Sequence, residues 1–189
     1  MDQFLRAVTE GDTKTVASML NQGLDANSAD PTGLSVLMIA SLQGHQDVVT
    51  LLLERRAALA RRSPHGDTAL MLASLKGHLP VVKLLVDRGA PVAPDEGWAP
   101  LHYAAFEGRT EVLKFLLDKG ADKNALAPNG YSPLMLAVRG GHVEATRTLL
   151  YADADLRIRG PSGETALGLS ATRKNEELQT LLRRAGAVE

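Results

Sequence analysis

The 189-residue chain contains no cysteine, which excludes disulfide bonds, a thiol nucleophile and thiolate metal ligands. Aromatic residues are scarce, at 4% of the chain. No apolar run approaches the ~20 residues that a membrane-spanning helix requires, so we expect no membrane insertion. A net charge of -1, from 21 basic and 22 acidic residues, gives no overall field that would attract nucleic acid or an anionic membrane. Any electrostatic recognition must therefore come from local groups.

The chain instead contains a motif that returns at a nearly fixed interval. Segments that begin at Gly33, Gly66, Gly97, Gly130 and Gly163 read GLSVLMIAS, GDTALMLAS, GWAPLHYAA, GYSPLMLAV and GETALGLSA. Subtracting successive glycine positions gives intervals of 33, 31, 33 and 33 residues. A period near 33 residues predicts a solenoid, in which each repeat contacts its neighbours and stacking builds a continuous core.

The repeat that covers residues 127–160 shows the expected local structure most clearly. Pro128-Asn129-Gly130 is a turn signal, and Ser132-Pro133 is typical of a helix N-cap followed by proline in the first turn. This helix should end at Gly140-Gly141, and a second helix should run from about 143 to 151. Asp153 then stands where other repeats have a glycine, so we expect it in the left-handed region. Each repeat is therefore expected to be a pair of short helices.

Several motifs in this register resemble those of ankyrin-repeat proteins. The hallmark Thr-Pro-Leu-His is most complete in Ala99-Pro100-Leu101-His102, and the Gly-His that opens the second helix is present in Gly44-His45, Gly77-His78 and Gly141-His142. Gly120-Ala121-Asp122-Lys123-Asn124 matches the segment that follows the second helix. The resemblance covers the whole chain and implies an all-α solenoid of stacked helix-turn-helix repeats joined by β-hairpin-like loops.

By this alignment we expect a single domain over residues 1–189. A narrower resemblance, to small stand-alone bacterial ankyrin-repeat proteins, depends on residues 97–103 and the shortened hairpin before them. It implies a location in the bacterial cytoplasm or periplasm, and we separately expect a monomer. The expected divisions are an N-terminal capping repeat at 1–29, full repeats at 30–62, 63–93, 94–126 and 127–159, and a C-terminal capping repeat at 160–189.

The histidines do not have the spacing of a metal site. His45, His78 and His142 occupy the same place in three repeats, and stacked helices lie about 8–10 Å apart whereas a Zn–N bond is about 2 Å. We therefore expect a structural role for them and no metal or other cofactor. For His102 the resemblance implies a local hydrogen bond, although Ala99 replaces the usual threonine partner.

Catalytic residues are not evident either. Ser35, Ser132 and Ser162 are explained as helix caps or turn residues, and neither a Gly-x-Ser-x-Gly motif nor a phosphate-binding glycine loop occurs. An enzyme would need a nucleophile, a base and an orienting group in one pocket. We therefore interpret the chain as a non-enzymatic protein.

The densest group of charges is basic and consists of Arg55, Arg56, Arg61 and Arg62. A nucleic-acid site would require these side chains to join into a stripe with stacking aromatic residues. We favour a solvated edge of the second helix and the hairpin, which leaves a nucleic-acid or small-ligand binder as the alternative function.

The resemblance implies that a protein or peptide partner binds the concave face, which is formed by the hairpin tips and the exposed side of the first helices. The expected contact positions flank the hairpin glycine or precede the glycine between the two helices. They are Leu34, Leu42, His65, Leu75, Lys76, Glu96, Trp98, Phe106, Glu107, Asn129, Tyr131 and Arg139.

Trp98, Phe106 and Tyr131 all fall at these positions although the chain has only seven aromatic residues (Trp 1, Tyr 3, Phe 3). Interface hot spots favour tryptophan, tyrosine and arginine, and Arg139 belongs to the same set. The alternative is that Trp98 and Tyr131 cover neighbouring hairpins. The shortened hairpin before Trp98 also predicts a notch beside this residue.

Overall fold

The computed structural model describes residues 2–94, 97–172 and 174–188. In these residues the chain forms twelve α-helices and no strand, and an isolated bridge joins Ala29 to Ser35. The predicted all-α class is therefore confirmed. No helix in the described residues has the length and apolar composition needed to cross a membrane. The chain divides into two compact units, Met1–Pro91 and Val92–Glu189, which are described separately below.

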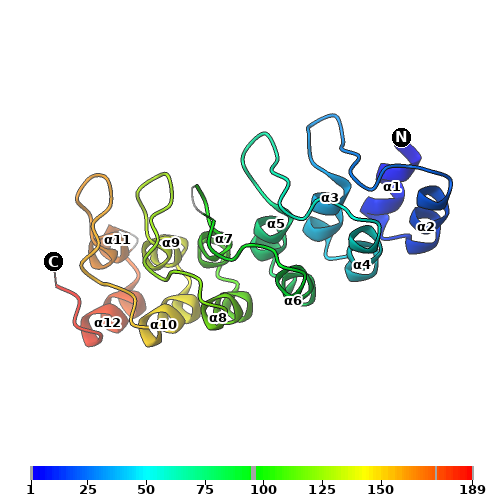
Figure 1. The fold of residues 1–189 in the computed structure, drawn as a ribbon. Coiled ribbons are helices and arrows are strands. Elements are labelled where there is room, and N and C mark those ends of the chain that lie inside the picture. The colour runs from blue at the N-terminus through cyan, green and yellow to red at the C-terminus, as the bar shows by residue number, and fades with distance from the viewer. Residues whose placement is uncertain (1, 95–96, 173, 189) are drawn as a thin grey trace. The chain divides into compact units, whose positions relative to one another are not determined.

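The first unit consists of three helical hairpins (Figure 1). In each hairpin the two helices pack against each other, and α3 also packs between α1 and α5. The second helices form a parallel row, with α4 against α2 and α6. The helices are α1 (Asp2–Glu10), α2 (Thr13–Asn21), α3 (Val36–Gln43), α4 (Gln46–Glu54), α5 (Ala69–Lys76) and α6 (Leu79–Asp87).

The second unit repeats this arrangement with three more hairpins (Figure 1). Here α9 lies between α7 and α11, and α10 lies between α8 and α12. The helices are α7 (Pro100–Phe106), α8 (Thr110–Asp118), α9 (Pro133–Gly140), α10 (Val143–Tyr151), α11 (Ala166–Thr172) and α12 (Glu176–Arg184).

The helix boundaries follow the local sequence signals. The Ser132 hydroxyl accepts a hydrogen bond from the Met135 N–H at 3.3 Å, and Pro133 is the first residue of α9. Gly141 ends this helix in the left-handed region, with φ of 80°. Asp153 lies in the same region, with φ of 56°, as the sequence predicts, and so does Arg56, which also replaces a glycine and has φ of 62°. Helix α9 is therefore capped at both ends.

The core is the contact layer between stacked helices. Leu52 of α4 and Leu116 of α8 are fully buried, and Leu37 and Leu134 of the first-helix rows are 1% exposed. Burial of such a side chain contributes about 1.5–3 kcal/mol. Because each repeat has only two short helices, its apolar face is covered only when the next repeat stacks on it.

The hairpin-like loops share a backbone pattern that projects their tips beyond the first helices. The Asp30 N–H donates to the Leu34 carbonyl at 2.9 Å, and the Ala127 N–H donates to the Tyr131 carbonyl at 3.0 Å. Pro94 occupies the corresponding position before Gly97 and has no N–H to donate. The hairpin that precedes Trp98 therefore differs chemically from the others.

The repeated histidines connect successive repeats within each unit. The Nε2–H of His45 donates to the Thr9 carbonyl at 2.8 Å, and that of His78 donates to the Leu42 carbonyl at 3.0 Å. In the second unit, His142 donates to the Phe106 carbonyl at 2.9 Å. Among the described residues, no group of three or more His, Cys, Asp or Glu side chains could hold a metal ion.

Candidate partner-binding surface

We call the hairpin tips together with the last turns of the first helices the hairpin face of each unit. In the first unit, this face carries the half-buried side chains of Leu34, Leu42 and Leu75. His65 and Lys76 are exposed beside them. Because α3 and α5 pack together, Leu42 and Leu75 lie at equivalent positions of neighbouring helices. The first unit therefore offers an apolar row with polar neighbours.

In the second unit, Trp98 lies just before α7 and packs on this helix. Its ring centroid is 5.8 Å from that of His102 in an edge-on arrangement, and 5.7 Å from that of Tyr103. The indole is half-buried, so part of it remains accessible. The contact with α7 fixes the orientation of a large ring at the surface.

Phe106 is the last residue of α7, and its side chain is 45% exposed. Glu107 follows it as the C-cap residue and forms an ion pair with Arg109 at 3.6 Å. Both partners of this pair are partly exposed, and such pairs contribute little to stability. Phe106 is thus an exposed aromatic side chain bordered by charge.

Tyr131 connects two hairpins. Its phenol donates a hydrogen bond to the Glu164 carboxylate at 2.5 Å, which raises the pKa of Tyr131 and lowers the pKa of Glu164. The guanidinium carbon of Arg139 lies 5.2 Å from the centroid of the Tyr131 ring. The exposed Asn129 accepts the Tyr131 N–H at 3.2 Å. Tyr131 therefore covers the neighbouring hairpin, as the alternative interpretation expected, and also contacts Arg139.

Only some of the expected contact residues are brought together. Tyr131 and Arg139 touch, whereas in the described part of the chain no ring contact joins Trp98 to Phe106 or Tyr131. Glu96 lies outside the described residues. The twelve positions remain a prediction as a binding site.

His102 is the buried polar residue beneath Trp98, and it is 1% exposed. Its Nδ1 accepts the Ala99 N–H at 2.9 Å, a backbone hydrogen bond that does not need the threonine side chain that Ala99 replaces. Because Nδ1 is an acceptor, the proton is on Nε2, which donates to the Ala125 carbonyl at 2.8 Å. Burial lowers the pKa of His102, so the neutral ring is the stable form.

We expect the second unit to become less stable as the pH falls below about 6.5, the ordinary pKa of histidine. The folded-state pKa of His102 lies below that value, so the unfolded chain binds a proton first. The contribution is fully present above the unfolded pKa and is lost as the pH falls toward the folded one. Urea unfolding followed by fluorescence of Trp98, the single tryptophan, measures this effect. A His102→Met variant that showed the same acid loss would contradict the assignment.

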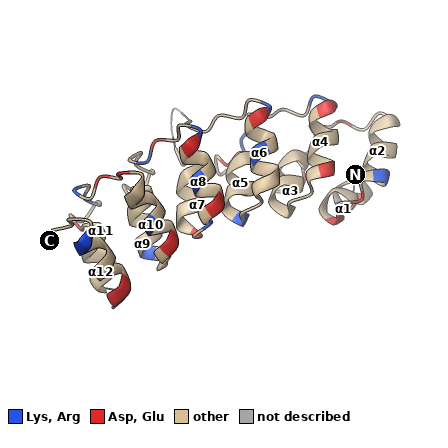
Figure 2. Ribbon diagram, turned by 90° about the horizontal axis from the view of Figure 1, so that it is seen from below, with Lys and Arg blue, Asp and Glu red and all other residues tan. Residues whose placement is uncertain are grey.

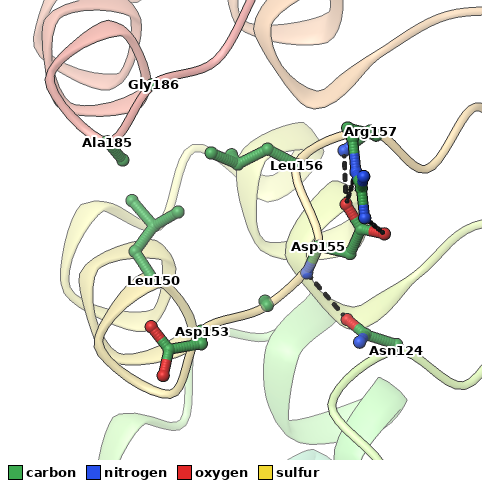
Figure 3. Close-up of a pocket in the computed structure, with 9 residues that line it drawn as sticks. Asn124, Leu150, Asp153, Asp155, Leu156, Arg157, Ala185 and Gly186 are labelled. Carbon is green, nitrogen blue, oxygen red and sulfur yellow. Dashed lines mark hydrogen bonds and ion pairs between the residues drawn. The ribbon is translucent and has the colours of Figure 1, made fainter.

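The sequence did not indicate several exposed features. Leu126, Tyr151 and Val188 are 56%, 80% and 75% exposed, and each is a large apolar or aromatic side chain. An open hollow of about 530 Å³ lies between the loop after α10 and the end of α12 (Figure 3). Its wall includes the ion pair of Asp155 and Arg157, at 3.0 Å.

The arginine cluster of the first unit makes hydrogen bonds to neutral acceptors. Arg55 donates to the Asn21 side chain at 2.9 Å, and Arg62 donates to the Gly66 carbonyl at 2.7 Å. Arg61 donates to the Asn27 carbonyl at 2.5 Å. Acidic and basic residues are interspersed along the helices (Figure 2). The guanidinium groups of Arg61 and Arg62 thus bond backbone oxygens, whereas that of Arg55 bonds a side chain.

The helix pairs, the left-handed caps and the histidine links define a helical-repeat protein. The chain belongs to the ankyrin-repeat family: the profile described as "Ankyrin repeats (3 copies)" matches residues 4–94, 59–127 and 120–188. The chain is also similar to the human ASB11 ankyrin repeat domain, with 27% identity and a TM-score of 0.92 over 98% of this chain and 84% of that one. Ankyrin repeats are generally protein–protein interaction modules, and their fold is typically non-catalytic.

A second similarity is local. Serine/threonine-protein kinase 12 from Arabidopsis thaliana is 36% identical over 55 residues, which is 29% of this chain. The matched stretch is only 12% of the length of that kinase. Because the match is this short, the kinase activity in that name is stated of the Arabidopsis protein alone.

Proposed function

We propose that this chain is a non-enzymatic binding module that holds a protein or peptide partner on its concave face, with the hairpin face of the second unit as the main contact. The capped, closely packed repeats present side chains on a preformed surface. Such a surface loses little conformational entropy when it binds. Affinity would then come from a few large side chains and their polar surroundings.

The observation that carries this proposal is the accessible aromatic side chains of the second unit. Phe106 is 45% exposed, and Trp98 and Tyr131 are half-buried at equivalent positions of successive hairpins. Because α7 and α9 pack together, the two hairpins belong to neighbouring repeats. The contact of Tyr131 with Arg139 supports a common face for the hairpin position and the last turn of the first helix.

The alternative functions have less support. A phosphate-binding surface gains from guanidinium groups that are free to reach the ligand, whereas Arg55, Arg61 and Arg62 each donate to a protein oxygen. Ligand pockets for small molecules are commonly about 300–1,000 Å³ and mostly apolar. The hollow between the loop after α10 and the end of α12 is open, and the ion pair of Asp155 and Arg157 forms part of its wall.

Affinity capture from the source cells with the full chain tests the proposed function. We expect at least one protein to be retained by the wild type and lost by a Trp98→Ala, Tyr131→Ala double variant. The reason is that the double variant removes two aromatic anchors from the same face. Circular dichroism checks that the double variant keeps its helices.

Tyr151→Ala provides a matched control, because Tyr151 is 80% exposed and lies at the end of α10, on the second-helix row. This variant should retain the same protein. If the double variant captured the protein as well as the wild type does, the hairpin face of the second unit would not be its binding site.

A further inference from the structure

Two asparagines make the same hydrogen bond between successive repeats. The Asn27 side-chain oxygen accepts the Ala58 N–H at 2.7 Å, and the Asn124 oxygen accepts the Asp155 N–H at 2.8 Å. Each asparagine stands four residues after the left-handed glycine of its own repeat, Gly23 or Gly120. Each donor stands two residues after the left-handed residue of the next repeat. At both places, an asparagine carboxamide therefore joins the loop after one second helix to the equivalent loop of the next repeat.

Two repeat boundaries have the donor but not the carboxamide: Arg157 stands at the asparagine position before Val188, and Ala93 stands there before Asp122. Four residues after Gly89 the chain has Ala93, and two residues after Gly120 it has Asp122. Nothing in the described residues accepts a hydrogen bond from the Asp122 backbone N–H. Ala60 also replaces the asparagine in its repeat, but there the donor position is Pro91, which has no N–H. Asp122 therefore has an N–H for which the expected partner is absent.

A hollow lies at the repeat boundary that includes Ala93 and Asp122. Its volume is about 230 Å³, and two segments of the chain line it, Val92, Ala93 and Pro94 from one and Ala121, Asp122 and Leu126 from the other. Ala99, Leu101 and His102 complete the lining. The loop that leads to it is short, because Gly97 is eight residues after Gly89 whereas Gly130 is ten residues after Gly120. Gly97 and Ala99, the neighbours of Trp98 in the chain, line this hollow, whereas Trp98 itself does not.

We propose that this hollow takes a glutamine side chain from the protein partner. The proposal rests on the proposed function, and the carboxamide oxygen would accept the Asp122 N–H as Asn124 does for Asp155. The methylene stem would lie on Ala93 and on Leu126, which is 56% exposed. A hollow smaller than the about 300–1,000 Å³ of small-molecule pockets fits a single side chain. Glutamine is proposed instead of asparagine because its side chain has one more methylene group. The longer side chain lets the carboxamide reach the Asp122 N–H from a partner that lies outside the hollow.

A titration of the ¹⁵N-labelled full chain with N-acetyl-glutamine methylamide tests the proposal without any partner. We expect a saturable downfield shift of the Asp122 amide proton at millimolar probe, because small fragments bind weakly. N-acetyl-leucine methylamide, which lacks the side-chain carboxamide, should leave the Asp122 amide proton in place. An Asp122 signal that did not respond to the glutamine probe, or that responded equally to both probes, would overturn the proposal.

An Ala93→Asn variant supplies the carboxamide from the chain itself. We expect it to slow hydrogen exchange of the Asp122 amide by about tenfold and to weaken binding of the glutamine probe by about tenfold. Ala60→Asn is the matched control and should change neither quantity, since Pro91 cannot donate. If Ala93→Asn bound the glutamine probe as tightly as the wild type does, the probe would bind outside this hollow. These outcomes test only the hollow. A negative probe titration would therefore overturn the glutamine proposal without deciding the proposed function, which the capture experiment tests.

Discussion

Replacement of His102 by leucine is expected to lower the free energy of unfolding of the second unit by about 3–5 kcal/mol. The imidazole satisfies two backbone groups at once, since it accepts from Ala99 and donates to Ala125. Leucine can do neither, and an unsatisfied buried polar group costs about 1–3 kcal/mol. Urea unfolding followed by Trp98 fluorescence measures the loss. A decrease below about 1 kcal/mol would mean that water replaces both bonds.

The chain itself suggests a control, because methionine occupies the equivalent place in other repeats. The Met38 sulfur accepts the Ser35 N–H at 3.4 Å, and the Met71 sulfur accepts the Thr68 N–H at 3.3 Å. His102→Met should therefore keep a weak acceptor for the Ala99 N–H and lose only the donor to Ala125. We expect its stability to lie between those of the wild type and His102→Leu.

Trp98→Ala is expected to weaken binding of the cognate partner by about 2 kcal/mol or more, which is roughly 30-fold in Kd. A half-buried ring that is oriented by contacts with His102 and Tyr103 has the properties of an interface anchor. Little stability should be lost, since Trp98 lies on the outside of α7 and not among the buried leucines. Calorimetric titration with the captured partner provides the measurement.

Tyr151→Ala is again the reference variant for this experiment, because its side chain is exposed and lies on a second helix. Its affinity should equal that of the wild type. Equal affinities of wild type and Trp98→Ala would reject Trp98 as a contact, and a large loss of helical structure in Trp98→Ala would assign the effect to folding.

Most of the fold could be predicted because the signals for helix ends are local. Ser132-Pro133 and Gly140-Gly141 predicted the first helix of one repeat, and α9 runs from Pro133 to Gly140. The position of Asp153 in the glycine register predicted its left-handed backbone, which has φ of 56°. Each of these inferences uses only the conformational preferences of neighbouring residues.

The candidate surface was less predictable because it depends on contacts between residues of different repeats. The bond of Tyr131 to Glu164 joins positions 33 residues apart, and neither residue alone indicates the other. The role of Ala99 was also hidden, because its backbone N–H and not its side chain meets His102. Leu126 is 56% exposed, and no motif of the sequence marks it as an exposed residue.

The histidine links have a consequence for how such a chain can grow or shrink. His45, His78 and His142 each donate to a main-chain oxygen of the preceding repeat, an acceptor that every amino acid provides. Duplication or recombination of whole repeats can therefore preserve this bond whatever residues the new neighbour carries. The pair formed by Tyr131 and Glu164 depends on two particular side chains, so it ties those two repeats to one order.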